Sequence, residues 1–306
     1  MWVPTNLSGS SRLALVSIEA LAQSRQAGES VTISFAINTP LHGAPADRRE
    51  RLLRALLRNR DQVLRLLLLL LAEGESNLTL EGGTHNPFAP PVDFLEKAYL
   101  PLVDRLGPRV EVQLVRPGFY PAGGGQFTVH IQPSKQLGRL ELVDRGQLVA
   151  RRVRVLLANL PRHIAERECR TIAQETGWGE ASFSIDEVEG SRGPGNAVMI
   201  ELEAEHVTEV FTAFGKLGVR AEDVATEALR QAEEYLAAGV PVGKCLADQI
   251  MLPLGIGAYL GSGGGMFRTM ELSLHATTHL EILRRFLEIG VQVDREDNDN
   301  CLVRLS

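Results

Sequence analysis

The sequence is poor in the features that define several large protein classes. Cysteine occurs only three times, at Cys169, Cys245 and Cys301, and no CxxC pair is present. The spacing of zinc ligands is therefore absent, and free thiols in a reducing compartment are expected. The most apolar stretch, residues 63–72, is about half the ~20 residues that a membrane-spanning helix needs. Because the N-terminus also lacks a secretory signal pattern, we expect a cytoplasmic protein with no membrane partner.

An excess of basic residues is also lacking. Lysine and arginine total 32 against 38 acidic residues, which gives a formal net charge of −6. A nucleic-acid partner would therefore need a local basic face. One candidate is an expected helix over residues 46–59, with leucines at helical spacing and five arginines, at Arg48, Arg49, Arg51, Arg54 and Arg58. The arginines could bind phosphates, but charge runs are usually solvated helix surfaces, which is the favoured interpretation.

The common nucleotide-binding and hydrolase motifs are missing. No GxxxxGK[ST] loop occurs, and the glycine–lysine pair at residues 239–244 has the wrong spacing. The glycines after Gly255 do not complete GxGxxG, and no GxSxG elbow is present. A chain of this kind would have to bind ATP without the usual phosphate loops.

Expected strands and helices alternate along the chain. Residues 110–115 and 127–132 alternate like strands, and residues 94–106 suit a helix with Asp93 as N-cap. A second unit begins near Arg151, and its helix over residues 223–238 ends at a glycine. The length of 306 residues predicts about two domains, and the alternation predicts an α/β or α+β class.

His275 is a candidate nucleophile. Residues 270–274 are expected to form a strand and residues 278–289 a helix, which places His275 at a strand-to-helix junction. A neutral imidazole nitrogen is a good nucleophile toward phosphorus, and a helix N-terminus stabilises phosphate oxygens. A histidine near a helix start is, however, often a capping or packing residue, so the pattern alone leaves both interpretations open.

A second candidate pair is Asp248 and Gln249, which lie in an apolar segment at an expected helix start. An acid beside an amide could bind a base, a ribose or a metal ion. Asp248 could equally act as the N-cap of the helix. The backbone N–H groups of Gly123–Gly125 could approach a phosphate, but a hairpin turn is the favoured interpretation there.

Six short motifs, in order along the chain, resemble those of RNA 3'-terminal phosphate cyclases. They are EGGTHNPFAPPVDF at residues 81–94, RPGFYPAGGG at 116–125, PRHIAER at 161–167, GPGN at 193–196, LADQ at 246–249, and SLH at 273–275 with Thr278. Each motif alone is weakly specific, whereas the ordered set is highly specific. The resemblance extends from about Leu78 to the C-terminus, and the glycine-rich and arginine-containing motifs that the family carries near its N-terminus are missing here.

The resemblance implies a large domain of repeated βαβαββ units with a smaller α/β domain inserted into it. The large domain would be discontinuous, over residues 1–147 and 240–306. The inserted domain would cover residues 148–239.

The resemblance also implies an ATP-dependent enzyme that acts on RNA 3' ends. A histidine attacks the α-phosphorus of ATP and releases pyrophosphate, with a divalent metal (Mg²⁺ or Mn²⁺) screening charge. AMP then passes to the RNA 3'-phosphate, and the neighbouring 2'-hydroxyl expels it to form a 2',3'-cyclic phosphate.

By position in the motifs, His275 resembles the adenylated histidine and Pro90 resembles a proline that lines the AMP pocket. The stretch made of Cys245, Leu246, Ala247, Asp248 and Gln249 resembles the family's nucleotide-contacting segment. Cys245 replaces the aromatic residue usual in the family, and His279 replaces an asparagine. A second hypothesis is a non-catalytic relative that acts as an RNA-binding or ribosome-assembly scaffold. A third is an enzyme that adenylates itself but acts on another phosphate end, or on DNA.

Overall fold

The computed structural model describes residues 31–34, 70 and 74–306. Three four-stranded mixed sheets are present in this part of the chain, each with one parallel pair. The predicted arginine-rich helix over residues 46–59 lies outside it. Within the described residues, no helix is both long and apolar enough to cross a bilayer.

The first sheet has the order β1-β2-β4-β3, and only the β1–β2 pair is parallel. Its strands are β1 (Val31–Ser34), β2 (Ser76–Gly82), β3 (Arg109–Arg116) and β4 (Gly125–Gln132). Alternate residues of β4 are buried, as the period of two predicts. The strands predicted at residues 110–115 and 127–132 are confirmed, and residues 117–124 form the connection between them.

The second sheet repeats this topology. Its order is β11-β12-β10-β5, and only the β10–β5 pair is parallel. Its strands are β5 (Arg139–Leu142), β10 (Gly264–Thr269), β11 (Val291–Arg295) and β12 (Cys301–Leu305), with helices α8 (Lys244–Tyr259) and α9 (Leu274–Leu287). Apart from the segment between β5 and α8, the chain order is therefore β5-α8-β10-α9-β11-β12, a βαβαββ unit.

The third sheet lies in the segment between β5 and α8. It has the order β7-β6-β8-β9 and contains β6 (Leu148–Ala158), β7 (Phe183–Glu187), β8 (Gly195–Ala204) and β9 (Thr208–Phe214), with helices α6 (His163–Thr176) and α7 (Ala221–Ala238). The helix predicted over residues 223–238 is α7, which ends at Gly239 in the left-handed conformation. The domain boundaries at residues 147/148 and 239/240 stay a prediction.

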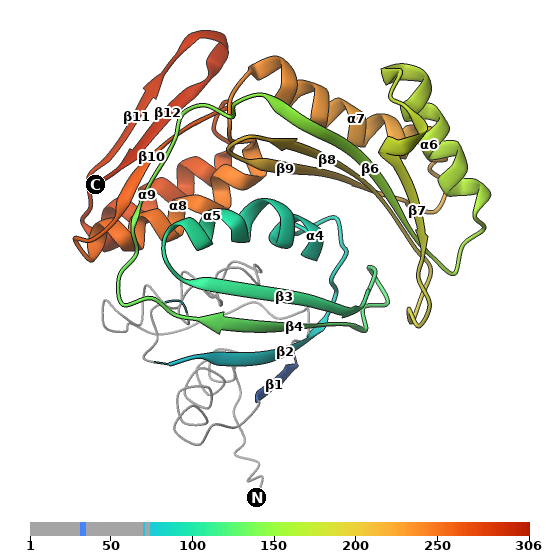
Figure 1. Ribbon diagram of the computed structural model, residues 1–306, viewed down its shortest axis with the longest axis horizontal. Coiled ribbons are helices and arrows are strands. Elements are labelled where there is room, and N and C mark those ends of the chain that lie inside the picture. The colour runs from blue at the N-terminus through green and yellow to red at the C-terminus, as the bar shows by residue number, and fades with distance from the viewer. Residues whose placement is uncertain (1–30, 35–69, 71–73) are drawn as a thin grey trace, which may run out of the picture.

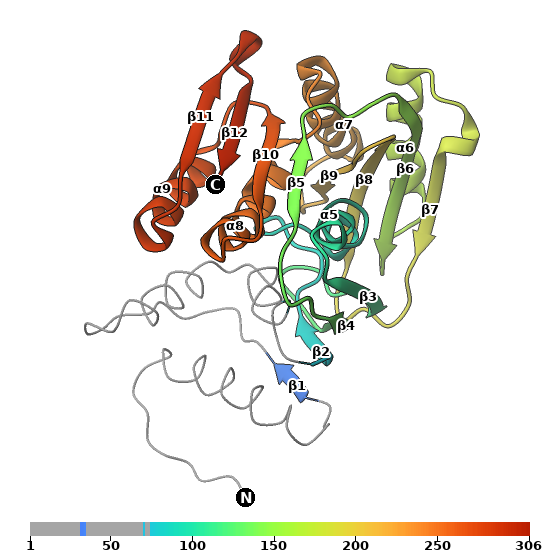
Figure 2. The same ribbon diagram turned by 60° about the vertical axis from the view of Figure 1, so that its left-hand side comes forward.

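Both faces of the third sheet are covered, as Figure 1 shows. Val153, Val155 and Leu157 of β6 pack in a cluster with α6 and α7. Leu156 and Ala158, which point the other way, belong to the larger core. That core lies around a helical run made of α4 (Val92–Phe94), a π-helical stretch η1 (Leu95–Tyr99) and α5 (Leu100–Arg105). The run lies between the third and first sheets (Figures 1 and 2).

The helical run corrects one prediction. Its N-cap residue is Pro91, and Asp93 is a buried residue of the first turn. The Asp93 carboxylate accepts a hydrogen bond from Nε2 of His85 at 2.9 Å and pairs with Arg154. Asp93 thus connects the loop after β2 to strand β6 and does not cap the helix.

Two predicted elements near His275 are also corrected. Residues 270–274 are not a strand, because β10 ends at Thr269, and the helix predicted over residues 278–289 begins earlier, at Leu274. Ser273 explains the earlier start: its hydroxyl accepts the backbone N–H of Ala276 at 2.9 Å, which satisfies one of the free donors at the helix start.

Candidate functional site

His275 lies in the first turn of α9 and is exposed. The sequence predicts that His275 precedes the helix. In the structure His275 belongs to the helix, so this prediction is wrong. The N-terminal turn carries a partial positive charge, and an anion that approaches His275 also approaches this turn. The position combines an accessible imidazole with an anion-favouring backbone.

The cap of α9 is joined to α8 through a side-chain hydrogen bond. Ser273 Oγ donates to Oδ1 of Asp248 at 3.1 Å while it accepts from the backbone of Ala276. Asp248 lies in the second turn of α8, because that helix begins at Lys244 with Gly243 as its N-cap. The interpretation of Asp248 as the N-cap of its own helix is therefore wrong. Its carboxylate instead accepts a hydrogen bond from the residue that caps the helix bearing His275.

His279 follows His275 by one helical turn. It is half-buried, and burial lowers its pKa, although a hydrogen bond with the Asp248 backbone acts in the opposite direction. A histidine with a lowered pKa is neutral at physiological pH. His279 therefore adds a neutral ring one helical turn from the exposed His275.

The predicted nucleotide-contacting segment divides into two faces of α8. Cys245 is exposed, and Asp248 and Gln249 are half-buried. Leu246 and Ala247 are 0% and 1% exposed and belong to the core. The helical spacing separates the two sets, because residues three and four apart share a face, as Cys245 does with Asp248 and Gln249. Cys245, Asp248 and Gln249 form the accessible face, and their contact with a nucleotide stays a prediction.

Pro90 lies on a different element. It is half-buried and immediately precedes Pro91, the N-cap of α4. The structure brings Asp248, His275 and His279 together. Pro90 is not part of this group: it precedes the helical run, whose η1 and α5 segments contact α8. Its role toward a nucleotide stays a prediction.

A buried carboxyl that no sequence motif indicates holds the start of α8. Glu209 of β9 is 1% exposed, and its Oε1 accepts the backbone N–H of Gly243 at 2.5 Å. Burial raises the pKa of Glu209 to about 8, with the Gly243 hydrogen bond acting against the shift. A single acid within a strand gives no signal for such a role, so sequence patterns alone could not identify it.

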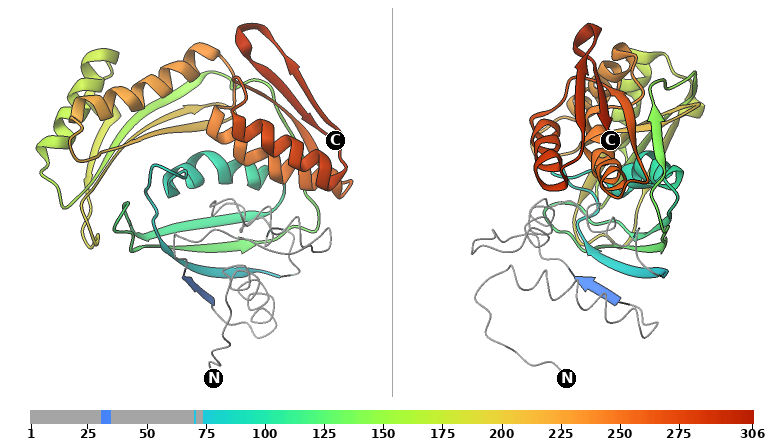
Figure 3. Two further views of the ribbon diagram at one scale, coloured as in Figure 1. Left: turned by 180° about the vertical axis from the view of Figure 1, so that it is seen from behind. Right: turned by 90° about the vertical axis from the view of Figure 1, so that its left-hand side faces the viewer.

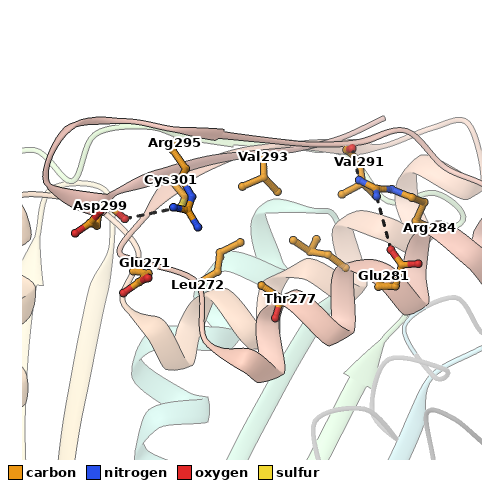
Figure 4. Close-up of a pocket in the computed structure, with 11 residues that line it drawn as sticks. Glu271, Leu272, Thr277, Glu281, Arg284, Val291, Val293, Arg295, Asp299 and Cys301 are labelled. Atoms are coloured by element: carbon orange, nitrogen blue, oxygen red, sulfur yellow. Dashed lines mark hydrogen bonds and ion pairs between the residues drawn. The ribbon is translucent and has the colours of Figure 1, made fainter.

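A pocket of about 240 Å³ lies on the other side of α9, between that helix and strands β11 and β12 (Figure 4). Leu272, Leu280, Val291 and Val293 give it an apolar interior, and charged side chains including Glu271, Arg284 and Arg295 surround it. His275 and Asp248 are not among its lining residues. The predicted site residues therefore do not use this pocket.

No group of three or more histidine, cysteine or acidic side chains in the described part of the chain is arranged to hold a metal ion. Asp248 accepts a hydrogen bond from Ser273, and a divalent cation that enters with nucleotide phosphates takes only one or two protein carboxylates. We therefore assign no residue to the metal that the motif resemblance implies.

The RPGFYPAGGG and GPGN motifs lie in and beside the β3–β4 and β7–β8 connections, and they contact each other. Gly195 lies directly against the ring of Phe119, and a Cβ at this position would come within 2.0 Å of that ring. Nδ2 of Asn159 donates to the carbonyls of Ser191 and Gly193 at 3.1 and 3.2 Å. These motifs therefore fix the contact between the β3–β4 and β7–β8 connections (Figure 3).

Comparison with known proteins agrees with these motifs. The family model for RNA 3'-terminal phosphate cyclase matches residues 62–293. The chain is 45% identical over 230 residues to an RNA 3'-terminal phosphate cyclase of Koribacter versatilis, covering 75% of this chain and 63% of the relative. A protein of the same description from Pseudomonas aeruginosa is 39% identical over 223 residues, covering 73% of this chain and 64% of the relative.

A third relative, from Pseudomonas fluorescens, is 42% identical over 224 residues, covering 73% of this chain and 64% of the relative. The chain thus spans less than two thirds of the length of the relatives that it matches. The family model covers most of the chain and includes the helices that bear Asp248 and His275. The chain therefore belongs to the RNA 3'-terminal phosphate cyclase family.

Proposed function

We propose that this protein converts an RNA 3'-terminal phosphate to a 2',3'-cyclic phosphate, with ATP as co-substrate and His275 as the residue that carries AMP. The observation that carries the proposal is the exposed His275 in the first turn of α9, with Asp248 bonded to the cap of that helix. The names of the relatives support the reaction class.

The chemistry follows from the position of His275. In the first step an imidazole nitrogen attacks the α-phosphorus of ATP, a P–N bond forms, and the bond to the bridging oxygen breaks to release pyrophosphate. The N-terminal turn of α9 favours the negative phosphate oxygens. An oxygen of the RNA 3'-phosphate then attacks the same phosphorus and breaks the P–N bond.

The last step closes the ring. The 2'-hydroxyl of the terminal ribose loses its proton, attacks the activated RNA phosphorus and expels AMP. Both reacting groups lie on one ribose, so proximity lowers the barrier. Covalent catalysis of this kind divides one difficult displacement into easier ones. A divalent cation that enters with the ATP phosphates would screen their negative charge, and no residue of this chain is assigned to it.

The first test is adenylylation of the purified protein. Label from α-phosphate-labelled ATP should remain on the protein through an acid-labile, base-stable bond, whereas label from the γ-phosphate should not. His275→Ala should abolish labelling. His163→Ala is the matched control, because His163 is also an exposed histidine in the first turn of a helix, α6.

The second test uses RNA. An oligoribonucleotide with a 3'-phosphate should become resistant to phosphatase, and its 3'-hydroxyl counterpart should remain unchanged. Labelling that survives His275→Ala would refute the assignment of the nucleophile. A folded wild-type protein that takes no label would refute the enzymatic proposal and favour the scaffold hypothesis.

A further inference from the structure

Two aromatic side chains project into solvent from the loops that carry family motifs. Phe88 is 66% exposed and Tyr120 is 53% exposed. Their ring centroids are 5.2 Å apart and the rings are nearly perpendicular, at 85°. An adjacent pair of large exposed aromatic rings leaves apolar surface in water, and such patches often mark binding sites.

The backbone holds both rings in this position. The N–H groups of Thr84 and His85 donate to the carbonyl of Gly118 at 2.9 and 3.0 Å, and the N–H of Tyr120 donates to the carbonyl of His85 at 3.2 Å. The side chain of Asn86 accepts the N–H of Phe88 at 2.9 Å. The exposure of the rings is therefore a property of a hydrogen-bonded scaffold, so little ordering is needed when a ligand binds.

A cation lies beside this loop. Arg192, in the β7–β8 connection, is exposed, and its stem lies over Gly124, where a Cβ would come within 2.2 Å of Cδ. Gly124 has φ +75°, so a side chain is excluded there on both counts. The β3–β4 and β7–β8 connections lie side by side in both Figure 1 and Figure 2.

Among the described residues Arg192 forms no ion pair, in contrast with its basic neighbours. Arg116 pairs with Glu81 at 3.4 Å, and Arg162 pairs with Glu187 at 2.6 Å. The guanidinium of Arg192 is therefore available for an anion. The loop that carries Tyr120 thus has an unpaired cation against it and an aromatic pair on it. Single-stranded nucleic acid is bound by such a combination, with bases stacked on the rings and a phosphate on the cation.

We propose that Phe88, Tyr120 and Arg192 form a docking surface for unpaired bases of the RNA strand whose 3' end is the substrate. This inference rests on the proposed function for its choice of RNA. A base-paired strand hides its base faces within the helix, so the surface selects single strands. Because Arg192 is the one cation that we assign to this surface, stacking supplies most of the affinity, and the salt dependence should be shallow.

The test measures binding of a short fluorescent oligoribonucleotide with a 3'-hydroxyl, in the absence of ATP, so that no turnover contributes. Phe88→Ala and Tyr120→Ala should each weaken binding roughly tenfold, as the loss of base stacking predicts. Phe88→Tyr and Tyr120→Phe should restore it, because both keep an aromatic face. Tyr259→Ala is the matched control: Tyr259 is 60% exposed at the end of α8 and should not matter.

Arg192 has its own readout. Arg192→Ala should make the slope of log affinity against log salt shallower by about 0.7, the contribution of one phosphate contact in a single strand. Arg192→Lys should retain the slope. Competition by the same sequence in a duplex should be much weaker than competition by the single strand.

The docking-surface proposal would be overturned if the wild-type protein bound no single-stranded RNA, or if Phe88→Ala and Tyr120→Ala bound it as tightly as wild type does. It would also be overturned if Tyr259→Ala reduced binding as much as those two variants do. Equal competition by the duplex would also overturn it. Failure of the proposed function has a different signature, namely absence of His275-dependent labelling while the ring variants still lose RNA binding.

Discussion

The hydroxyl of Ser273 lies 3.1 Å from Oδ1 of Asp248, to which it donates, and it accepts the N–H of Ala276 at 2.9 Å. One side chain thus completes the N-terminal turn of α9 and joins that turn to α8. His275 lies in this turn, so its position depends on a contact between two helices.

Ser273→Ala should separate the two roles of this contact. Loss of an N-cap side chain costs about 1 kcal/mol of folding free energy, which urea denaturation would measure. The adenylylation rate at saturating ATP should fall further than this modest loss explains, because the turn bearing His275 is no longer fixed. Ser273→Thr keeps the hydroxyl and should restore both quantities. Unchanged labelling in a destabilised Ser273→Ala protein would show that Asp248 does not position the site.

The raised pKa of the buried Glu209 carboxyl predicts that the folding stability of the protein falls as pH rises. Its pKa is raised from 4.5 to about 8 by burial, so the folded protein holds a proton that the unfolded chain has released between these values. The free energy of unfolding therefore decreases through this window, by at most about 1.4 kcal/mol per pH unit. Glu209→Gln keeps an acceptor for Gly243 and should flatten the pH dependence of the melting temperature.

Glu168 contributes in the same direction. Burial raises its pKa to about 7, while Asn196 donates to its Oε2 at 2.9 Å and lowers it. Glu209→Gln alone should therefore leave a residual slope below pH 7, and only the double variant with Glu168→Gln should remove most of it. A pH slope identical in wild type and double variant would contradict this assignment.

The contact between Gly195 and Phe119 predicts a strong position effect for alanine. Gly195→Ala places a methyl group within 2.0 Å of the ring, and overpacking of this kind costs about 1–3 kcal/mol or more. Gly179→Ala is the control, since nothing lies within 4 Å of a Cβ at Gly179 and its φ of −70° suits alanine. Thermal denaturation should show a large shift for the first variant and almost none for the second. Phe119→Leu combined with Gly195→Ala should recover part of the loss.

Asp93 predicts sensitivity to acid. Burial raises its pKa, but the hydrogen bond and charge of His85 and the charge of Arg154 outweigh that effect, so the net pKa lies below 3.8. The unfolded chain therefore binds a proton before the folded protein does, and the stability due to Asp93 is lost as pH falls through its lowered pKa. Asp93→Asn should lose about 1–3 kcal/mol at neutral pH and less relative to wild type in acid. A loss that does not shrink on acidification would refute the ionic role.

The sequence predicted the type of element well wherever a pattern was long. The helix ending at Gly239 and the strands around residues 117–124 were found because their periods and end signals agree. Strand β9 was missed, since its seven residues follow β8 after a three-residue gap and give little independent pattern. Helix α8 was only partly recognised, because Pro253 and two glycines lie within it; tertiary burial overrides their low helix propensity.

In the candidate site, too, motifs predict residues better than they predict contacts. A motif indicates His275, but the predicted helix begins four residues too late, because the sequence pattern does not reveal that Ser273 is the N-cap. The partner of Ser273 is Asp248, 25 residues earlier, and no local pattern connects residues at such a separation. Leu246 and Ala247 share a motif with Asp248, but only the three-dimensional packing shows that their side chains are core.

The exposed face of α8 makes one cysteine available for chemical labelling. The three thiols differ in access: Cys245 is exposed, Cys169 is half-buried with its pKa raised to about 11 by burial, and Cys301 is buried. An alkylating reagent needs an accessible thiolate, so mild treatment selects Cys245. That sulfur lies in the first turn of α8, on the same face as Asp248. The wild-type chain therefore carries its own attachment point for a spectroscopic reporter one helical turn from the carboxylate that holds Ser273.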